Sequence, residues 1–300
     1  MAIVHSLYVN SCVICNRLFG PRQMMNQHYT PLQKFSQQIF LKREDLSPTG
    51  SHKFRYFQKK ISQLKSHGVS RIVRSTTGNA GISAAMIGKE FGISVFAVMS
   101  EKADLSKARQ IELEGGTLIF SESPIKTAKL LSKKLNIPLI RMSQDDRGIA
   151  HYESLGNEII QEIPNARAIV LYCTSGTSTL GIISAYLKSG LICPEIHIVH
   201  PGKLYRKQVI LKFLQQCHGR AWRFKKGDIE RAGKTLQAFG VESSFEGLAS
   251  FHVGMKLSKD RSPVVVILTG KKWPEGKPEN PIRIRSFEDI QKFINSHSLL

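Results

Sequence analysis

The sequence predicts an α/β protein built from two three-layer α/β/α domains, with mostly parallel sheets and the active site in the cleft between them. From residue 39 onward, short apolar segments alternate with segments whose apolar residues recur at helical spacing. Such alternation implies parallel strands covered by helices on both faces. A chain of 300 residues is long enough for two such units, and a polar stretch, Ser143–Gly148, interrupts the alternation near its middle.

The first half of the pattern alternates four predicted strands with four predicted helices. The helices follow from apolar spacing, as in Phe54, Phe57, Ile61 and Leu64, or from small residues, as in Ala80–Ala85. The expected strands are Ile39–Lys42, Arg71–Arg74, Ser94–Met99 and Thr117–Phe120, and the expected helices are 54–64, 80–85, 105–113 and 125–135.

The second half resumes with a helix at Tyr152–Ile163 and ends with a short helix at Phe287–Ile294. Pro263–Leu268 is apolar throughout, which is typical of a strand buried on both faces, and the Pro-rich piece Trp273–Pro281 is expected to be a surface loop. The other expected strands are 168–173 and 196–199, and the other expected helices are 180–187, 204–217, 228–239 and 245–257. We expect a smaller domain of residues 55–148 and a larger one of residues 1–54 together with 149–300.

Composition and charge narrow the class of protein. No stretch reaches the ~18 consecutive apolar residues of a membrane span, and the first residues lack the order of a secretory signal, so we expect a cytoplasmic protein. The net charge of +20 is spread thinly, without an arginine-rich block or a nucleic-acid-binding signature, so a solvated basic surface is expected and not a nucleic-acid partner. Cys12 and Cys15 form a single CxxC whose second half is missing, so no metal site is expected.

Chemistry is expected in the loops that follow Lys42, Arg74, Cys173 and Leu268, because sites in such folds lie at the carboxyl ends of strands. In the first loop a Pro/Gly turn leads to Lys53, which opens a helix. The positive end of the helix dipole and partial desolvation lower the pKa of such a lysine, and imine formation requires the neutral amine. A solvated lysine at a helix start is the alternative.

The second and third loops each link a strand to a helix and contain the residue types of an anion site. Residues 75–81, STTGNAG, combine hydroxyls and backbone amides in a way that suits a carboxylate. Residues 174–181, TSGTSTLG, could cradle a phosphate, and they match neither a Walker loop nor a dinucleotide loop. An ordinary capping turn is the alternative in both places. The fourth loop offers Thr269 directly after the buried strand.

Taken together and in this order, the loops resemble those of the fold-type II pyridoxal-phosphate enzymes, the tryptophan synthase β family. LKREDLSPTGSHKFR resembles the lysine loop of that family, STTGNAG its asparagine loop, TSGTSTLG its phosphate loop and VVVILTG its pyridine-nitrogen strand. Thr30-Pro31-Leu32 and VESSFEGLAS also match segments of the family, so the resemblance spans roughly residues 30 to 270. Departures occur: Arg74 stands where tryptophan synthase β has an acidic residue, and the phosphate loop is poorer in glycine than in most relatives.

The resemblance implies a role for each loop. Lys53 would carry pyridoxal 5'-phosphate as a Schiff base and act as the catalytic base, Asn79 would bind the ring hydroxyl, and Thr269 would face the pyridine nitrogen. The phosphate would be held by Ser175, Gly176, Thr177 and Ser178. The substrate carboxylate would be held by Thr76, Thr77, Gly78 and Ala80.

The implied reaction is β-elimination or β-replacement on a small amino acid such as serine, threonine or O-acetylserine, by way of an aminoacrylate. A neutral hydroxyl at the pyridine nitrogen favours this chemistry over transamination. The subfamily stays open between cysteine synthase, threonine synthase and serine/threonine dehydratase types, and a homodimer is expected. A non-catalytic descendant that serves as a binding or regulatory protein is the alternative, motivated by the altered phosphate loop and the basic charge.

Overall fold

The computed structural model describes residues 29–202 and 204–297. Contacts divide the chain into Met1–Thr30 and Pro31–Leu300, and the described sheets all belong to the second unit. Cys12 and Cys15 lie outside the described residues, so the expectation about their CxxC stays a prediction.

Six strands form the larger sheet of the described chain, in the order β1-β2-β9-β6-β7-β8. The two outer strands of one edge, β1 and β2, are antiparallel, and every other neighbouring pair is parallel. The strands are β1 (Leu32–Lys34), β2 (Ile39–Lys42), β6 (Ala168–Tyr172), β7 (Glu195–Val199), β8 (Ala221–Trp222) and β9 (Val264–Ile267).

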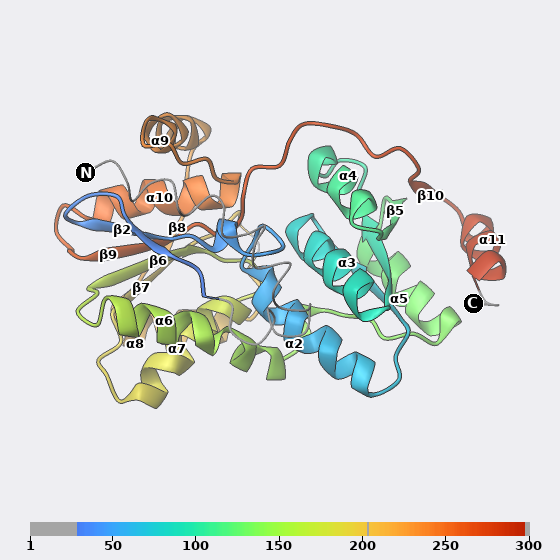
Figure 1. Cartoon of the computed structure of the whole chain (residues 1–300), viewed down its shortest axis with the longest axis horizontal. Coiled ribbons are helices and arrows are strands. Elements are labelled where there is room, and N and C mark those ends of the chain that lie inside the picture. The colour runs from blue at the N-terminus through green and yellow to red at the C-terminus, as the bar shows by residue number, and fades with distance from the viewer. Residues whose placement is uncertain (1–28, 203, 298–300) are drawn as a thin grey trace, which may run out of the picture. The chain divides into compact units, whose positions relative to one another are not determined.

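Helices cover both faces of this sheet, which explains why β9 is apolar without alternation. Val264 and Val266 pack into the core beneath α9 and α10, whereas Val265 and Ile267 pack into the core beneath α6, α7 and α8. Figure 1 shows these two helical layers on opposite sides of the strands. The helices are α6 (Glu153–Glu162), α7 (Thr177–Ser189), α8 (Lys207–Gln216), α9 (Lys226–Ala238) and α10 (Phe245–Leu257).

The smaller sheet has four parallel strands in the order β10-β5-β4-β3. Helices α3 and α4 contribute to the core on one face, and α5 and α11 to the core on the other. The strands are β3 (Arg71–Ser75), β4 (Ser94–Met99), β5 (Thr117–Ser121) and β10 (Ile282–Ile284). The helices are α2 (Lys53–Ser66), α3 (Asn79–Phe91), α4 (Leu105–Leu113), α5 (Pro124–Leu135) and α11 (Phe287–His297), with 3-10 turns at η1 (Glu44–Leu46), η2 (Met142–Gln144) and η3 (Arg147–Tyr152).

The C-terminal segment differs from the expected grouping of residues 149–300. After β9 the chain passes through residues 268–281 and adds β10 to the smaller sheet, parallel to β5 (Figure 1). Ile290, Phe293 and Ile294 of α11 then complete the apolar core of that sheet. An amphipathic helix must bury its apolar face, and the apolar side chains of α5 and β5 form a surface against which α11 packs. The remaining domain boundaries stay a prediction.

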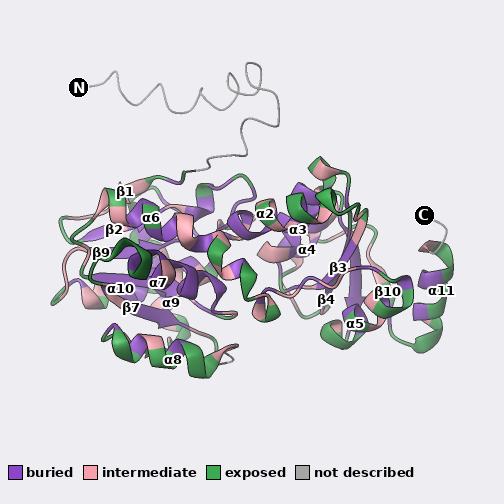
Figure 2. Ribbon diagram, turned by 90° about the horizontal axis from the view of Figure 1, so that it is seen from below, coloured by how far each residue is buried: buried purple, intermediate pink, exposed green. Residues whose placement is uncertain are grey.

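The predicted fold class, two α/β/α layered units with mostly parallel sheets, is confirmed by the sheets and their helices. Ser94–Met99, Leu105–Leu113 and Phe245–Leu257 have the predicted bounds. Figure 2 shows β3 and β7 coloured as buried, and exposed residues on the outer surface of helices such as α8. Among the described helices, none has the length and apolar character needed to cross a membrane.

Candidate active site

The loops selected from the sequence meet around one cavity of about 460 Å³, a volume that suits a small ligand. Its lining includes the first turn of α2, the loop between β3 and α3, the loop between β6 and α7, and Thr269, the second residue after β9. The carboxyl ends of these parallel strands therefore face a common space. Of the predicted site residues, eight line the cavity: Lys53, Thr76, Thr77, Asn79, Ala80, Ser175, Ser178 and Thr269. The other three, Gly78, Gly176 and Thr177, do not line it.

Lys53 is the first residue of α2 and borders the cavity. Burial, followed by the nearby charge of Arg74, lowers the pKa of its amine to about 8. At pH 7 about a tenth of such an amine is neutral, whereas an ordinary lysine is neutral in less than about a thousandth of molecules. The predicted lowering of this pKa is thus found, with desolvation as its main cause.

His52 ties the lysine loop to the end of β9. Its backbone N–H donates to the carbonyl of Thr269 at 3.1 Å, and its ring Nδ1 lies 2.8 Å from the same oxygen. Burial, and then the charge of Lys53, lowers the pKa of the imidazole to about 3, so the ring is neutral and Nδ1 carries its proton toward the carbonyl. The residue before Lys53 and the residue expected at the pyridine nitrogen are therefore fixed to each other.

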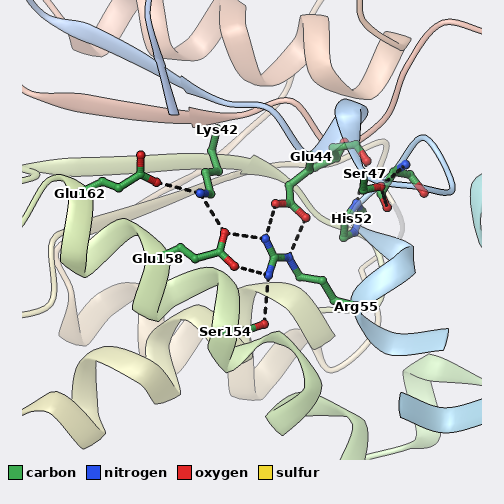
Figure 3. Close-up of polar contacts among 10 residues, drawn as sticks. Lys42, Glu44, Ser47, His52, Arg55, Ser154, Glu158 and Glu162 are labelled. Carbon is green, nitrogen blue, oxygen red and sulfur yellow. Dashed lines mark hydrogen bonds and ion pairs between the residues drawn. The ribbon is translucent and has the colours of Figure 1, made fainter. Parts of the chain in front are cut away.

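A buried ion network holds the start of α2 in place (Figure 3). The Arg55 guanidinium donates to both oxygens of Glu44 at 2.7 and 2.8 Å and to both oxygens of Glu158 at 2.6 and 2.8 Å. Lys42 at the end of β2 lies 2.9 Å from Glu158 and 2.9 Å from Glu162. Because Glu44 belongs to the lysine loop and both other acids to α6, the network joins three elements around the helix that presents Lys53.

The loop between β3 and α3 is shaped by two of its own residues. Gly78 has a φ of 141°, and a Cβ there would lie 2.2 Å from the Lys107 side chain, so only glycine fits. The Thr76 hydroxyl accepts hydrogen bonds from the amides of Gly78 and Gly81 at 3.1 and 3.0 Å. This hydroxyl thus caps the loop, which is the alternative that the sequence left open, while Thr77 and Ala80 border the cavity at the start of α3.

Two serines border the cavity here, Ser175 in the loop before α7 and Ser178 in the first turn of that helix. Gly176 has a φ of 80°, and a Cβ there would lie 2.4 Å from Ile210, so the turn into the helix requires glycine. The Thr177 hydroxyl points elsewhere, donating to the carbonyl of Met142 at 3.1 Å. Its side chain therefore supports the loop and does not face the cavity.

Several residues at the site were not selected from the sequence. Arg206 donates from Nη1 to the Ser175 carbonyl and the Met142 carbonyl, both at 3.0 Å, and so supports the loop before α7. Tyr205 lines the cavity, as does Glu246 at the start of α10. The rule that sites lie beyond the carboxyl ends of parallel strands could have identified 200–206, because this loop follows β7.

The residues around the cavity fit the cofactor that the resemblance implies. Pyridoxal phosphate needs an amine for its aldehyde, a helix N-terminus or hydroxyls for its phosphate, and a polar partner for its ring nitrogen. Lys53 supplies an amine of lowered pKa, the start of α7 supplies two hydroxyls and amide groups, and Thr269 is a neutral hydroxyl at the end of β9. The donor set therefore matches the group.

Comparison with solved structures shows the same fold. The O-acetylserine-dependent cystathionine β-synthase from Helicobacter pylori superposes with a TM-score of 0.71 at 21% identity, covering 81% of this chain and 93% of that one. The apo form of Escherichia coli diaminopropionate ammonia lyase superposes with a TM-score of 0.72 at 13% identity, covering 82% of this chain and 84% of that one. At such identities the likeness concerns the fold.

Comparison with curated sequences and families identifies the chain's relatives. The catabolic L-threonine dehydratase TdcB of Staphylococcus aureus (strain USA300) is 28% identical over 222 residues, which are 72% of this chain and 60% of that protein. The L-threonine ammonia-lyase of Thermotoga maritima is 30% identical over 170 residues, 54% of this chain and 41% of that protein. The chain thus spans about three fifths or less of the length of these relatives. The model of the family described as "Pyridoxal-phosphate dependent enzyme" matches residues 24–218, and the chain therefore belongs to this family.

Proposed function

We propose that this protein catalyses β-elimination or β-replacement on a small amino acid, with pyridoxal phosphate held by Lys53. One observation carries the proposal: an amine with a pKa of about 8 shares a cavity with two helix-opening loops and with Thr269. The names of the curated relatives, L-threonine dehydratase and L-threonine ammonia-lyase, support a lyase acting on such a substrate.

The residues divide the work as follows. When bound, pyridoxal phosphate withdraws electrons from the α-carbon of an amino acid and so acidifies its α-hydrogen. Lys53 accepts that proton, because a neutral amine at this position is a base of suitable pKa. Thr269 offers a neutral hydroxyl to the ring nitrogen, which leaves that nitrogen largely unprotonated and favours loss of a β-substituent over transamination.

The two loops bind the anionic ends of the cofactor and the substrate. Ser175, Ser178 and the amides at the start of α7 hold the phosphate, and Asn79 binds the ring hydroxyl. Thr77 and Ala80 lie at the start of α3, where free amides and the helix dipole stabilise the α-carboxylate of the substrate. Thr76 and Gly78 shape this loop, and Gly176 and Thr177 shape the other.

We further propose a cytoplasmic homodimer. The described cysteines, Cys173, Cys193 and Cys217, are all free thiols, which is typical of a reducing compartment. Exposed apolar side chains such as Ile192 and Leu187 offer surface for self-association. Light scattering on the purified protein tests the dimer, and a monomer at micromolar concentration would contradict it.

The proposed function is tested with Lys53→Ala, with Lys59→Ala on the exposed side of α2 as the matched control. The parent and Lys59→Ala should bind pyridoxal phosphate with near-visible absorption, and borohydride should fix the cofactor on the peptide that contains Lys53. Lys53→Ala should lose this attachment and at least about a hundredfold of any turnover of serine, threonine or O-acetylserine. Cofactor fixed on another lysine would contradict the role of Lys53, and a parent that binds no cofactor would favour the non-catalytic alternative.

A further inference from the structure

Arg74 is a buried cation at the cavity whose charge no residue of the described chain balances. It occupies the fourth position of β3, is 5% exposed and borders the cavity. Its Nε and Nη1 atoms have no hydrogen-bond partner among the described residues, and Nη2 makes one long bond, 3.3 Å, to the carbonyl of Ser75. The Phe57 ring covers one face of the guanidinium, at 4.8 Å from its centroid.

Arg55, the other buried arginine near the site, differs from Arg74 because carboxylates neutralise its charge. Arg55 as a whole residue is as little exposed as Arg74, and two carboxylates bind its guanidinium, those of Glu44 and Glu158. No ion pair forms between Arg74 and a described carboxylate, and its strongest electrostatic neighbours are the phenols of Tyr56 and Tyr152. A buried charge without a counterion is costly, so a protein retains one where a ligand supplies the counterion.

The balance of charge around the cavity indicates the sign of that ligand. Among the described lining residues, Lys53, Arg74 and Arg141 are basic, and Glu246 is the acidic one. Glu246 is already paired with Lys107, whose Nζ lies 3.2 Å away. Burial lowers the pKa of the Arg74 guanidinium to about 10, so it still carries its charge at neutral pH. The cavity therefore attracts an anion, and Arg74, which borders it, has two nitrogens without a hydrogen-bond partner among the described residues, Nε and Nη1.

The position of Arg74 indicates that this anion is neither of the two for which a binding site is already proposed. The start of α3 is proposed to bind the α-carboxylate of the substrate, and the start of α7 is proposed to bind the phosphate of the cofactor. Arg74 precedes the first of these loops and is near enough to Lys53 to lower its pKa. We propose that Arg74 is a specificity-determining residue that binds a second anionic group, on the side chain of the amino-acid substrate. This inference rests on the proposed function and narrows the substrate class to amino acids with a carboxylate or phosphate on the side chain.

The first test measures binding without turnover. Calorimetry with the cofactor-loaded protein compares succinate with butyrate, which differ by one carboxylate and lack the amine that reaction requires. The parent should bind succinate at least about tenfold more tightly, because a guanidinium fork makes charge-assisted bonds to the second carboxylate. Arg74→Met should reduce the ratio to about twofold or less. Arg71→Met, on the same strand but away from the cavity, should keep the parent's ratio.

The second test uses O-phospho-L-serine against L-serine and L-aspartate against L-asparagine. Arg74→Met should lower kcat/KM for the anionic member of a pair at least about tenfold more than for the neutral member, with the difference mainly in KM, because any effect of Arg74 on the pKa of Lys53 acts on both members alike. Arg74→Lys should restore part of the preference for the anionic substrate, because lysine keeps the positive charge but lacks the two parallel N–H donors of a guanidinium. If Arg74→Met does not fold, Arg74→Lys takes its place in the comparison with the parent.

Three results would overturn the inference. Equal affinity of the parent for succinate and butyrate would show that Arg74 meets no second anion. An equal loss of both ligands in Arg74→Met would assign the guanidinium to the α-carboxylate. A loss of pyridoxal phosphate but not of pyridoxal would assign it to the cofactor phosphate. Failure of the proposed function is distinguishable, because a protein that turns over no amino acid still reports its succinate preference by calorimetry.

Discussion

Asn79 depends on a neighbour from the other end of the chain for the orientation of its amide. The indole N–H of Trp273 donates to Asn79 Oδ1 at 3.2 Å. An indole nitrogen can only donate, so its partner must be the carbonyl oxygen, and the amide nitrogen of Asn79 is left to donate elsewhere. Nδ2 is the atom that the proposed contact with the ring hydroxyl of the cofactor requires. We therefore predict that Trp273 is a positioning residue.

Trp273→Phe should weaken cofactor binding while leaving the fold unchanged. The phenyl ring keeps the contact with Lys271, whose Nζ lies 3.9 Å from the indole centroid, but loses the hydrogen bond. A neutral hydrogen bond contributes about 0.5–1.5 kcal/mol, so the Kd for pyridoxal phosphate should rise by about twofold to tenfold. Trp222→Phe is the matched control, because Trp222 donates to His197 outside the cavity. An unchanged Kd in Trp273→Phe, or an equal rise in both variants, would refute the positioning role.

At the scale of elements, α2 is fixed by charge at its first turns and by apolar packing farther along. Phe54, Phe57 and Ile61 enter the core shared with α3, while Arg55 on another side of the helix enters the ion network of Figure 3. The carboxylates raise the pKa of the Arg55 guanidinium above its ordinary value despite burial, so this guanidinium stays charged at every ordinary pH. Lys53 is thus presented by a helix whose start has little freedom to shift.

Arg55→Met should be strongly destabilising, whereas Arg74→Met should not. Removing Arg55 leaves Glu44 buried without its cation, and breaking a buried pair in this way costs about 3–5 kcal/mol. Removing Arg74 takes away an uncompensated charge, so the free energy of unfolding of the cofactor-free protein should stay equal or rise. Urea unfolding of both variants gives the comparison. Similar destabilisation by the two substitutions would show that Arg74 has a structural partner after all.

At the scale of the whole molecule, the sequence predicts those helices and strands whose apolar residues follow a regular pattern. Val264–Ile267 is apolar at each position, and this alone places it inside a sheet covered on both faces. Lys53 was selected because its loop follows a predicted strand and resembles the lysine loop of the pyridoxal-phosphate enzymes, and its role stays a prediction. Ile282–Ile284 was not predicted as a strand, since three residues with Arg283 in the middle carry no periodicity and β10 exists through its pairing with β5. The sequence could not predict that the charge of Arg74 is unbalanced, because this depends on which carboxylates lie next to it in the folded chain.

The two sheets are joined across the site by an ion pair. Lys107 on α4, in the layer of the smaller sheet, binds Glu246 on α10, in the layer of the larger one. The two side chains are 10% and 26% exposed. Burial alone would raise the pKa of Glu246, but Lys107 and nearby hydrogen bonds outweigh it and hold the pKa below its ordinary value of 4.5. The pair should therefore stabilise the connection between the two layers.

A double-mutant cycle with Lys107→Met and Glu246→Gln measures this coupling. At pH 7 the coupling should be about 1 kcal/mol, as for a well-formed pair that is partly open to solvent. Because the folded-state pKa of Glu246 is lowered, its contribution is fully present above pH 4.5 and is lost as the pH falls through the folded value. The coupling should accordingly persist down to pH 4.5 and vanish in more acidic solution, while the cycle cancels the titration of other carboxylates. A coupling near zero at pH 7, or one that does not change in acid, would show that the pair does not hold the layers together.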